Sequence, residues 1–101
     1  MTNKSKQKGN NFERELVKQA QEFELKAKRA WGSNGESLGL EPDVDLIIDD
    51  YIKVQAKLRR KLPDCLQIPK SCDVTVFRQD RGETLMLMRW KEFLEFVNKI
   101  K

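Results

Sequence analysis

Histidine is absent from this chain, and cysteine and proline are scarce. Of 101 residues, two are cysteine and three are proline. Without histidine there can be no zinc site that uses imidazole and no catalytic triad that depends on it. The spacing of Cys65 and Cys72 matches no zinc-binding pattern. We therefore expect a reducing location, cytoplasmic or otherwise inside the cell.

Long apolar runs are also missing, and the chain shows no signal-peptide pattern, so no membrane partner is expected. Charge, in contrast, is abundant: 36% of the residues are charged, and the formal net charge is +4. This excess of positive charge indicates an anionic partner, although only weakly by itself. The length is that of one domain, and a hydrophobic content of 39% is enough for a core.

The order of the predicted elements indicates an α/β fold. We expect residues 1–9 to be a flexible basic arm and residues 10–101 to form a single domain. Apolar residues at helical spacing predict one helix from Asn10 or Asn11 to about Ala27 and another at the C-terminus. A short helix over residues 64–68 is expected to cross the sheet. Strands are predicted over residues 26–31, 44–48, 51–57, 74–78 and 84–88.

The second and third of these strands form a predicted hairpin around the turn residues Asp49 and Asp50. Because side chains alternate across a strand, Asp45 shares one face with Asp43, and Lys57 shares one face with Gln55. If these two polar faces coincide, an acidic group, an amide and an ammonium group converge beside a hydrophobic sheet. Charged groups in such a half-buried position destabilise the fold unless they are paired with an opposite charge, so their presence suggests a functional role.

This arrangement resembles the signature of the PD-(D/E)xK nuclease superfamily, an acidic residue followed on the next strand by an acidic-x-Lys triplet. Here the triplet is Gln55-Ala56-Lys57. Two further segments are similar to archaeal-type Holliday junction resolvases of that superfamily. Lys8-Gly9 precedes Glu13-Arg14-Glu15-Leu16, as a Lys-Gly precedes their Glu-Arg-Glu-Leu-type motif, and Arg29-Ala30-Trp31-Gly32-Ser33 matches their Arg-x-x-Gly-Ser segment. The resemblance covers about residues 8–57.

The resemblance implies a restriction-endonuclease-like αβββαβ core with a mixed central sheet of about five strands and a C-terminal helix. It also implies a homodimeric endonuclease that depends on Mg²⁺ or Mn²⁺, needs no small-molecule cofactor, and cleaves phosphodiester bonds in branched or otherwise structured DNA. Asp45 is the expected main metal ligand, with Asp43 as an alternative or additional one, and Lys57 is expected to orient or activate water. The other expected ligands are Glu13, Gln55 and the carbonyl of Ala56. Expected contacts to nucleic acid are Lys8, Arg14, Arg29, Ser33, Arg59, Arg60 and Lys61.

The sequence departs from the superfamily at Gln55, where a carboxylate is usual; an amide still offers an oxygen to a cation but brings no charge. A nucleic-acid-binding module that has kept the fold but lost hydrolysis is therefore the alternative function, and an adaptor with merely charged surfaces is a third. Single residues also have simpler explanations. Glu13 is suited to helix capping with Asn10, and Lys57 to a solvated strand position paired with Asp45.

Overall fold

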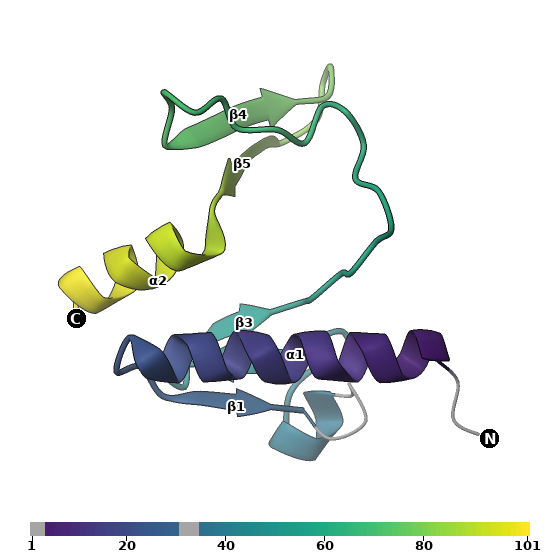
Figure 1. Cartoon of the computed structure of the whole chain (residues 1–101), viewed down its shortest axis with the longest axis vertical. Coiled ribbons are helices and arrows are strands. Elements are labelled where there is room, and N and C mark those ends of the chain that lie inside the picture. Colours follow the sequence, from purple (N-terminus) through teal and green to yellow (C-terminus); the bar gives the residue numbers. More distant parts are fainter. Residues whose placement is uncertain (1–3, 31–34) are drawn as a thin grey trace. The chain divides into compact units, whose positions relative to one another are not determined.

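The computed structural model describes residues 4–30 and 35–101 of this small α/β protein, so the predicted contact Ser33 lies outside the described residues. The chain divides into two compact units, Met1–Leu58 and Arg59–Lys101, where one domain was predicted. The first unit holds α1 and a three-stranded antiparallel sheet. The second holds a two-stranded antiparallel sheet and α2 (Figure 1).

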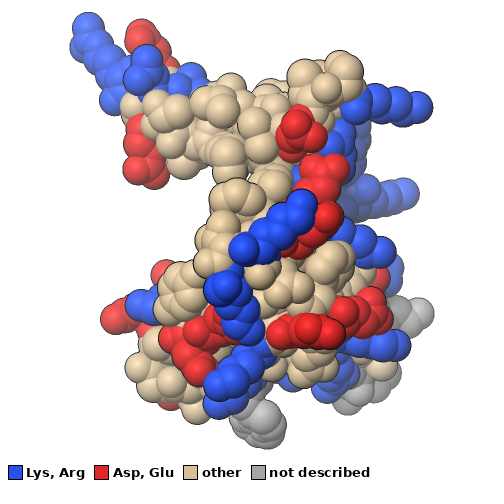
Figure 2. Space-filling model, turned by 90° about the vertical axis from the view of Figure 1, so that its left-hand side faces the viewer, with Lys and Arg blue, Asp and Glu red and all other residues tan. Residues whose placement is uncertain are grey.

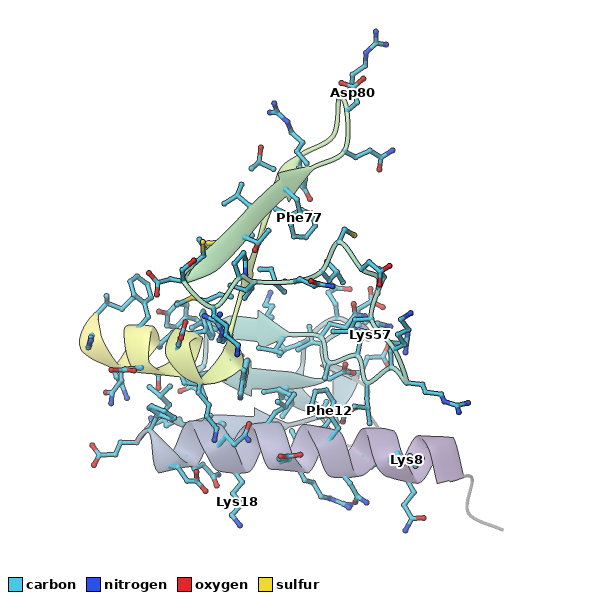
Figure 3. All side chains as sticks on the ribbon, turned by 45° about the horizontal axis from the view of Figure 1, so that its top comes forward. Lys8, Phe12, Lys18, Lys57, Phe77 and Asp80 are labelled. Atoms are coloured by element: carbon cyan, nitrogen blue, oxygen red, sulfur yellow. The ribbon has the colours of Figure 1, made fainter. Side chains whose placement is uncertain are left out.

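Helix α1, Lys4–Glu22, begins earlier than predicted, so residues expected to belong to a flexible arm form its first turns. Its apolar positions recur at helical spacing, and Leu16 and Ala20 are buried in the core. Figure 3 shows Phe12 on the side of α1 that faces the strands and Lys18 on the opposite side. The predicted amphipathic helix is therefore present, with its buried side against the sheet of the same unit.

The C-terminus of α1 is closed by a left-handed residue that is not glycine. Glu24 has φ 61°, and its N–H donates to the carbonyl of Gln21 at 2.9 Å. The N–H of Leu25 donates to the carbonyl of Ala20 at 3.1 Å, which completes a Schellman pattern. Leu25 and Ala20 are both buried, so the cap also adds an apolar contact where the chain turns towards the first strand.

The sheet of the first unit has the order β1-β2-β3, with β1 Ala27–Arg29, β2 Leu46–Ile48 and β3 Ile52–Val54. The central strand β2 is an unbroken apolar run that is entirely buried. Helix α1 packs on β1 and β2. The core of this unit is thus one helix on one small antiparallel sheet.

The turn between β2 and β3 lies at Asp49 and Asp50, as predicted. Both residues have positive φ, 54° and 63° respectively, and the N–H of Tyr51 donates to the carbonyl of Ile48 at 3.2 Å. Two successive left-handed residues are the mark of a type I′ turn, whose twist matches that of a hairpin. Aspartate tolerates this conformation better than most residues other than glycine and asparagine.

The second unit confirms the predicted bounds of its two strands and the presence of a helix near the C-terminus. Strands β4, Val74–Arg78, and β5, Thr84–Met88, pair along their whole length, and α2, Trp90–Lys99, follows at once. The tip of this hairpin turns tightly, because the N–H of Gly82 donates to the carbonyl of Gln79 at 2.7 Å. In Figure 3, Asp80 marks the tip.

Two fold predictions are not confirmed. Residues 64–68 form turns rather than a crossing helix. Side chains from elsewhere in the unit bond the carbonyls of this connection: Thr75 Oγ1 donates to Gln67 at 2.6 Å, and Arg89 donates to Pro69 at 3.1 Å and to Cys72 at 3.0 Å. The five strands also form one sheet of three and one of two, not a single mixed sheet. Within the described ranges, no helix has both the length and the apolar content that a bilayer span requires.

The early start of α1 predicts that Gly9→Ala stabilises the protein. Gly9 lies inside the helix, and a Cβ there would meet no atom within 4 Å. Alanine in a helix interior is favoured over glycine by about 0.5–1 kcal/mol. Urea denaturation should show this gain in the free energy of unfolding. An unchanged midpoint would mean that residues 4–9 are not helical in solution.

Candidate functional site

A compact loop leads to Asp45 and the strand β2 that follows it. It begins with the 3-10 helix η2, Gly35–Leu38, and the N–H of Leu40 donates to the carbonyl of Gly35 at 2.9 Å. The N–H of Val44 then donates to the carbonyl of Glu41 at 3.1 Å. Gly35 is buried, and a Cβ there would overlap the carbonyl oxygen of Glu41. Only glycine lets the two backbone segments approach so closely, and this approach fixes the entry into β2.

Asp45 stands at the end of this loop, directly before β2, and only 8% of its surface is exposed. Its carboxylate oxygen Oδ2 accepts a hydrogen bond of 2.7 Å from the N–H of Ala56. Its carbonyl accepts from the N–H of Ala30 at 2.8 Å, and its own N–H donates to the carbonyl of Val54 at 2.9 Å. Asp45 is therefore held on both sides, by the residue after β1 and by the residues at the end of β3.

The pairing of β2 with β3 is irregular at this point. Val54 is the register partner of Leu46, yet its carbonyl also accepts the N–H of Asp45. Two residues of one strand opposite one residue of the next is the arrangement of a β-bulge, which re-aims side chains and often lies beside active sites. Two residues beyond Val54, the N–H of Ala56 donates to the carboxylate of Asp45 instead of to a backbone carbonyl. Strand β3 consequently ends at Val54, before the predicted residue 57.

Glu13 is the second buried acidic residue, with 5% of its surface exposed. The Nε of Arg29 donates to its Oε1 at 3.0 Å, which joins α1 to the end of β1. The two side chains are 7% and 18% exposed, so this ion pair is largely removed from solvent. Breaking such a pair by removing one partner is strongly destabilising, by about 3–5 kcal/mol, because the other charge stays buried.

These contacts bring together part of the predicted site. Asp45 meets Ala56, the middle residue of the triplet, and Gln55 and Lys57 flank that residue with exposed side chains. Glu13 is tied to Arg29, and Asp45 is tied to Ala30, the next residue of the chain. Both buried acidic residues are thus attached to adjacent positions at the end of β1.

Other predicted residues have exposed side chains. Asp43 is exposed in the turn before β2, and Lys8 and Arg14 are exposed on α1. Arg14 Nη1 is 3.3 Å from Asn11 Oδ1 of the same helix. The basic run of residues 59–61 is exposed and belongs to the second unit. On the face shown in Figure 2, basic and acidic side chains are interspersed.

The oxygen atoms of Asp45, Gln55 and Ala56 are of the chemical types that suit a hard divalent cation. A carboxylate, the Gln55 amide and the Ala56 carbonyl are the ligand types that Mg²⁺ accepts, and Mg²⁺ keeps several waters besides. Among residues 4–30 and 35–101, no hydrogen bond engages the second oxygen of Asp45, Oδ1. Yet no three acidic or cysteine side chains in the described part of the chain gather to hold a metal ion. The donor set fits a weakly held cation with much of its coordination completed by water.

Comparison of the chain with models of protein families, with curated protein sequences and with solved structures returned no match.

Two residues of the site have roles that the sequence did not predict. Arg29 was expected to contact nucleic acid, but it pairs with Glu13. Gly35 was given no role, but it permits the close packing of the loop before Asp45. A Glu that is buried on the apolar side of a helix needs a positively charged partner, so the pairing of Glu13 with some cation could have been inferred from the sequence. The packing at Gly35 had none, because Glu41 approaches it only in the folded loop.

Gly35→Ala is therefore expected to destabilise the protein and displace Asp45. The new Cβ overlaps backbone, which does not yield like a flexible side chain, and overpacking of this kind costs about 1–3 kcal/mol. Denaturant unfolding measures the loss. The matched control is Gly39→Ala in the same loop, where no atom lies within 4 Å and only the φ of 73° adds strain. A Gly35→Ala variant as stable as the wild type would contradict the close approach.

Proposed function

We propose that this protein is a homodimeric, metal-dependent endonuclease that acts inside the cell on branched or otherwise structured DNA. The observation that carries the proposal is the hydrogen bond of 2.7 Å between the Asp45 carboxylate and the N–H of Ala56. It joins the buried acidic residue to the middle of the Gln55-Ala56-Lys57 triplet. The two halves of the resemblance, one directly before β2 and one directly after β3, thereby meet at one point.

The order of elements in the first unit also supports the proposal. Helix α1 followed by β1, β2 and β3 corresponds to the first four elements of an αβββαβ core. Glu13 comes from the helix, Asp45 directly precedes β2 and the triplet directly follows β3, which is the order along the chain that the resemblance implies. The full core, with five strands in one mixed sheet, remains part of the proposal.

The chemistry follows from these side chains. Asp45, with Gln55, the Ala56 carbonyl and Glu13, would hold Mg²⁺ or Mn²⁺. Such an ion, when bound, activates water and stabilises the charge that develops on a phosphodiester. Lys57, exposed beside the bonded amide of Ala56, would place its ammonium group against the attacking water or the phosphate oxygens. The burial of Asp45 and Glu13 limits the water that competes for their oxygens.

A second candidate is a nucleic-acid-binding module without hydrolysis. The ion pair between Glu13 and Arg29 favours it, because a guanidinium group already neutralises one of the two buried carboxylates. Gln55 favours it as well, since an amide brings no negative charge to attract a cation. In this candidate the basic residues bind phosphates, which gives affinity without reading sequence.

The deciding experiment incubates the full chain with a four-way junction, duplex DNA and single-stranded DNA, each in Mg²⁺, Mn²⁺ or EDTA. The first candidate requires cleavage that EDTA abolishes and that Asp45→Asn removes. Binding that weakens with salt, without any cleavage, supports the second candidate. Absence of binding to all three substrates rejects both.

Lys57→Ala is expected to abolish cleavage and leave DNA binding nearly unchanged. One lysine contributes about one phosphate contact to the footprint, so the slope of log K against log salt should fall by about one at most. Gel-shift and cleavage assays on the same junction separate the two effects. Lys53→Ala is the matched control, because Lys53 is an exposed lysine of β3 outside the triplet. Normal cleavage by Lys57→Ala would remove Lys57 from the chemistry.

Gln55→Glu is expected to lower the Mg²⁺ concentration needed for cleavage, or to reveal cleavage in an otherwise silent protein. A carboxylate near a divalent cation adds attraction, about 4 kcal/mol for each pair of unit charges at 4 Å and an effective dielectric of 20, much of which desolvation offsets. DNA binding without metal should weaken slightly. The control Gln21→Glu adds the same charge at an exposed position near the end of α1. Superimposable Mg²⁺ titrations of wild type and Gln55→Glu would show that Gln55 is not a ligand.

A further inference from the structure

The ion pair between Arg29 and Glu13 occupies an atom that a metal ion would need. Arg29 Nε lies 3.0 Å from Glu13 Oε1, and both side chains are largely buried. A guanidinium group is always charged and forms strong hydrogen bonds to carboxylates. A divalent cation that approaches this oxygen must therefore displace Arg29 or bind with the positive guanidinium group close by.

The neighbouring residue on β1 provides a comparison. Lys28 carries the same charge as Arg29 but is exposed, whereas Arg29 is mostly buried. In the sheet Lys28 pairs with Ile47 and Arg29 pairs with Leu46, so alternation directs the two side chains to opposite faces. Arg29 is on the face that bears α1 and Glu13. Of these two cations on β1, Arg29 is thus the one placed to compete at the carboxylate.

We propose that Arg29 is a positioning residue that holds Glu13 in the metal-free protein and competes with the divalent cation for its carboxylate. This inference rests on the proposed function, because it takes Glu13 to be a metal ligand. Arg29 keeps the buried charge of Glu13 neutralised until a cation arrives. Binding of the cation requires the guanidinium group to leave Oε1, which lowers the apparent affinity for metal.

The test is a calorimetric titration of the EDTA-stripped full chain with Mn²⁺ alone, which needs neither DNA nor cleavage. Arg29→Gln is expected to bind Mn²⁺ at least about fivefold more tightly than wild type. A fivefold change in affinity is at the lower end of what one binding event usually does to another. Arg29→Lys restores the charge and should return the affinity towards that of wild type. Lys28→Gln removes the same charge from the neighbouring exposed position and should leave the affinity unchanged.

The outcomes separate this inference from the proposed function. Equal or weaker Mn²⁺ binding by Arg29→Gln overturns the competition while leaving the metal site intact. Mn²⁺ binding that is undetectable in every variant overturns the metal-dependent function and this inference together. If Arg29→Gln is unfolded in EDTA, Mn²⁺ is expected to restore its circular dichroism spectrum, because the cation then neutralises Glu13. A variant that stays unfolded at every Mn²⁺ concentration also overturns the competition.

Discussion

The hydrogen bond from the Ala56 N–H to Asp45 determines how the proposed site is built. Asp45 is only 8% exposed, and burying its carboxylate is costly unless polar groups bond it; here a backbone amide does so at 2.7 Å. The bond replaces a backbone pair of the β2–β3 ladder, so it ends one strand and fixes the segment that follows. Gln55 and Lys57 owe their placement to it, because each is one residue from the bonded amide.

The hairpins could be predicted from the sequence because their signals are local. Strands β4 and β5 have the bounds that their β-rich runs indicated, and Asp49 and Asp50 adopt the left-handed turn that favours such residues. Residues 64–68 were predicted wrongly as a helix. The carbonyls at and after the end of this segment are bonded by side chains from later in the chain, that of Gln67 by Thr75 and that of Pro69 by Arg89. No local pattern reveals such partners.

The residues of the proposed site could be named from the sequence, but their geometry could not. The sequence indicated Asp45 and the triplet, and in the structure Asp45 accepts a hydrogen bond from Ala56, the middle residue of that triplet. Simple alternation of side chains along the strands, however, does not hold where β2 begins, because Asp45 and Leu46 both lie opposite Val54. The partner of Glu13 was also missed. Because the segment Arg29–Ser33 resembled one that contacts DNA, Arg29 was not considered as the counter-ion of Glu13. Which cation answers a buried carboxylate depends on packing between α1 and β1, which the sequence does not display.

Without a metal ion, the charged residues of the proposed site already sum to a net charge of zero. Arg29 neutralises Glu13, and a backbone amide bonds Asp45, while Lys57 stands one residue beyond that amide. With a neutral Gln55, the charges of Asp45 and Lys57 also cancel. A glutamate at position 55 would leave an excess negative charge, which favours a cation, whereas the glutamine adds no charge that a cation must balance. In the proposed site, Gln55 and Arg29 would therefore act in the same direction, since each would lower the affinity for metal while the oxygen atoms that could hold it stay in place.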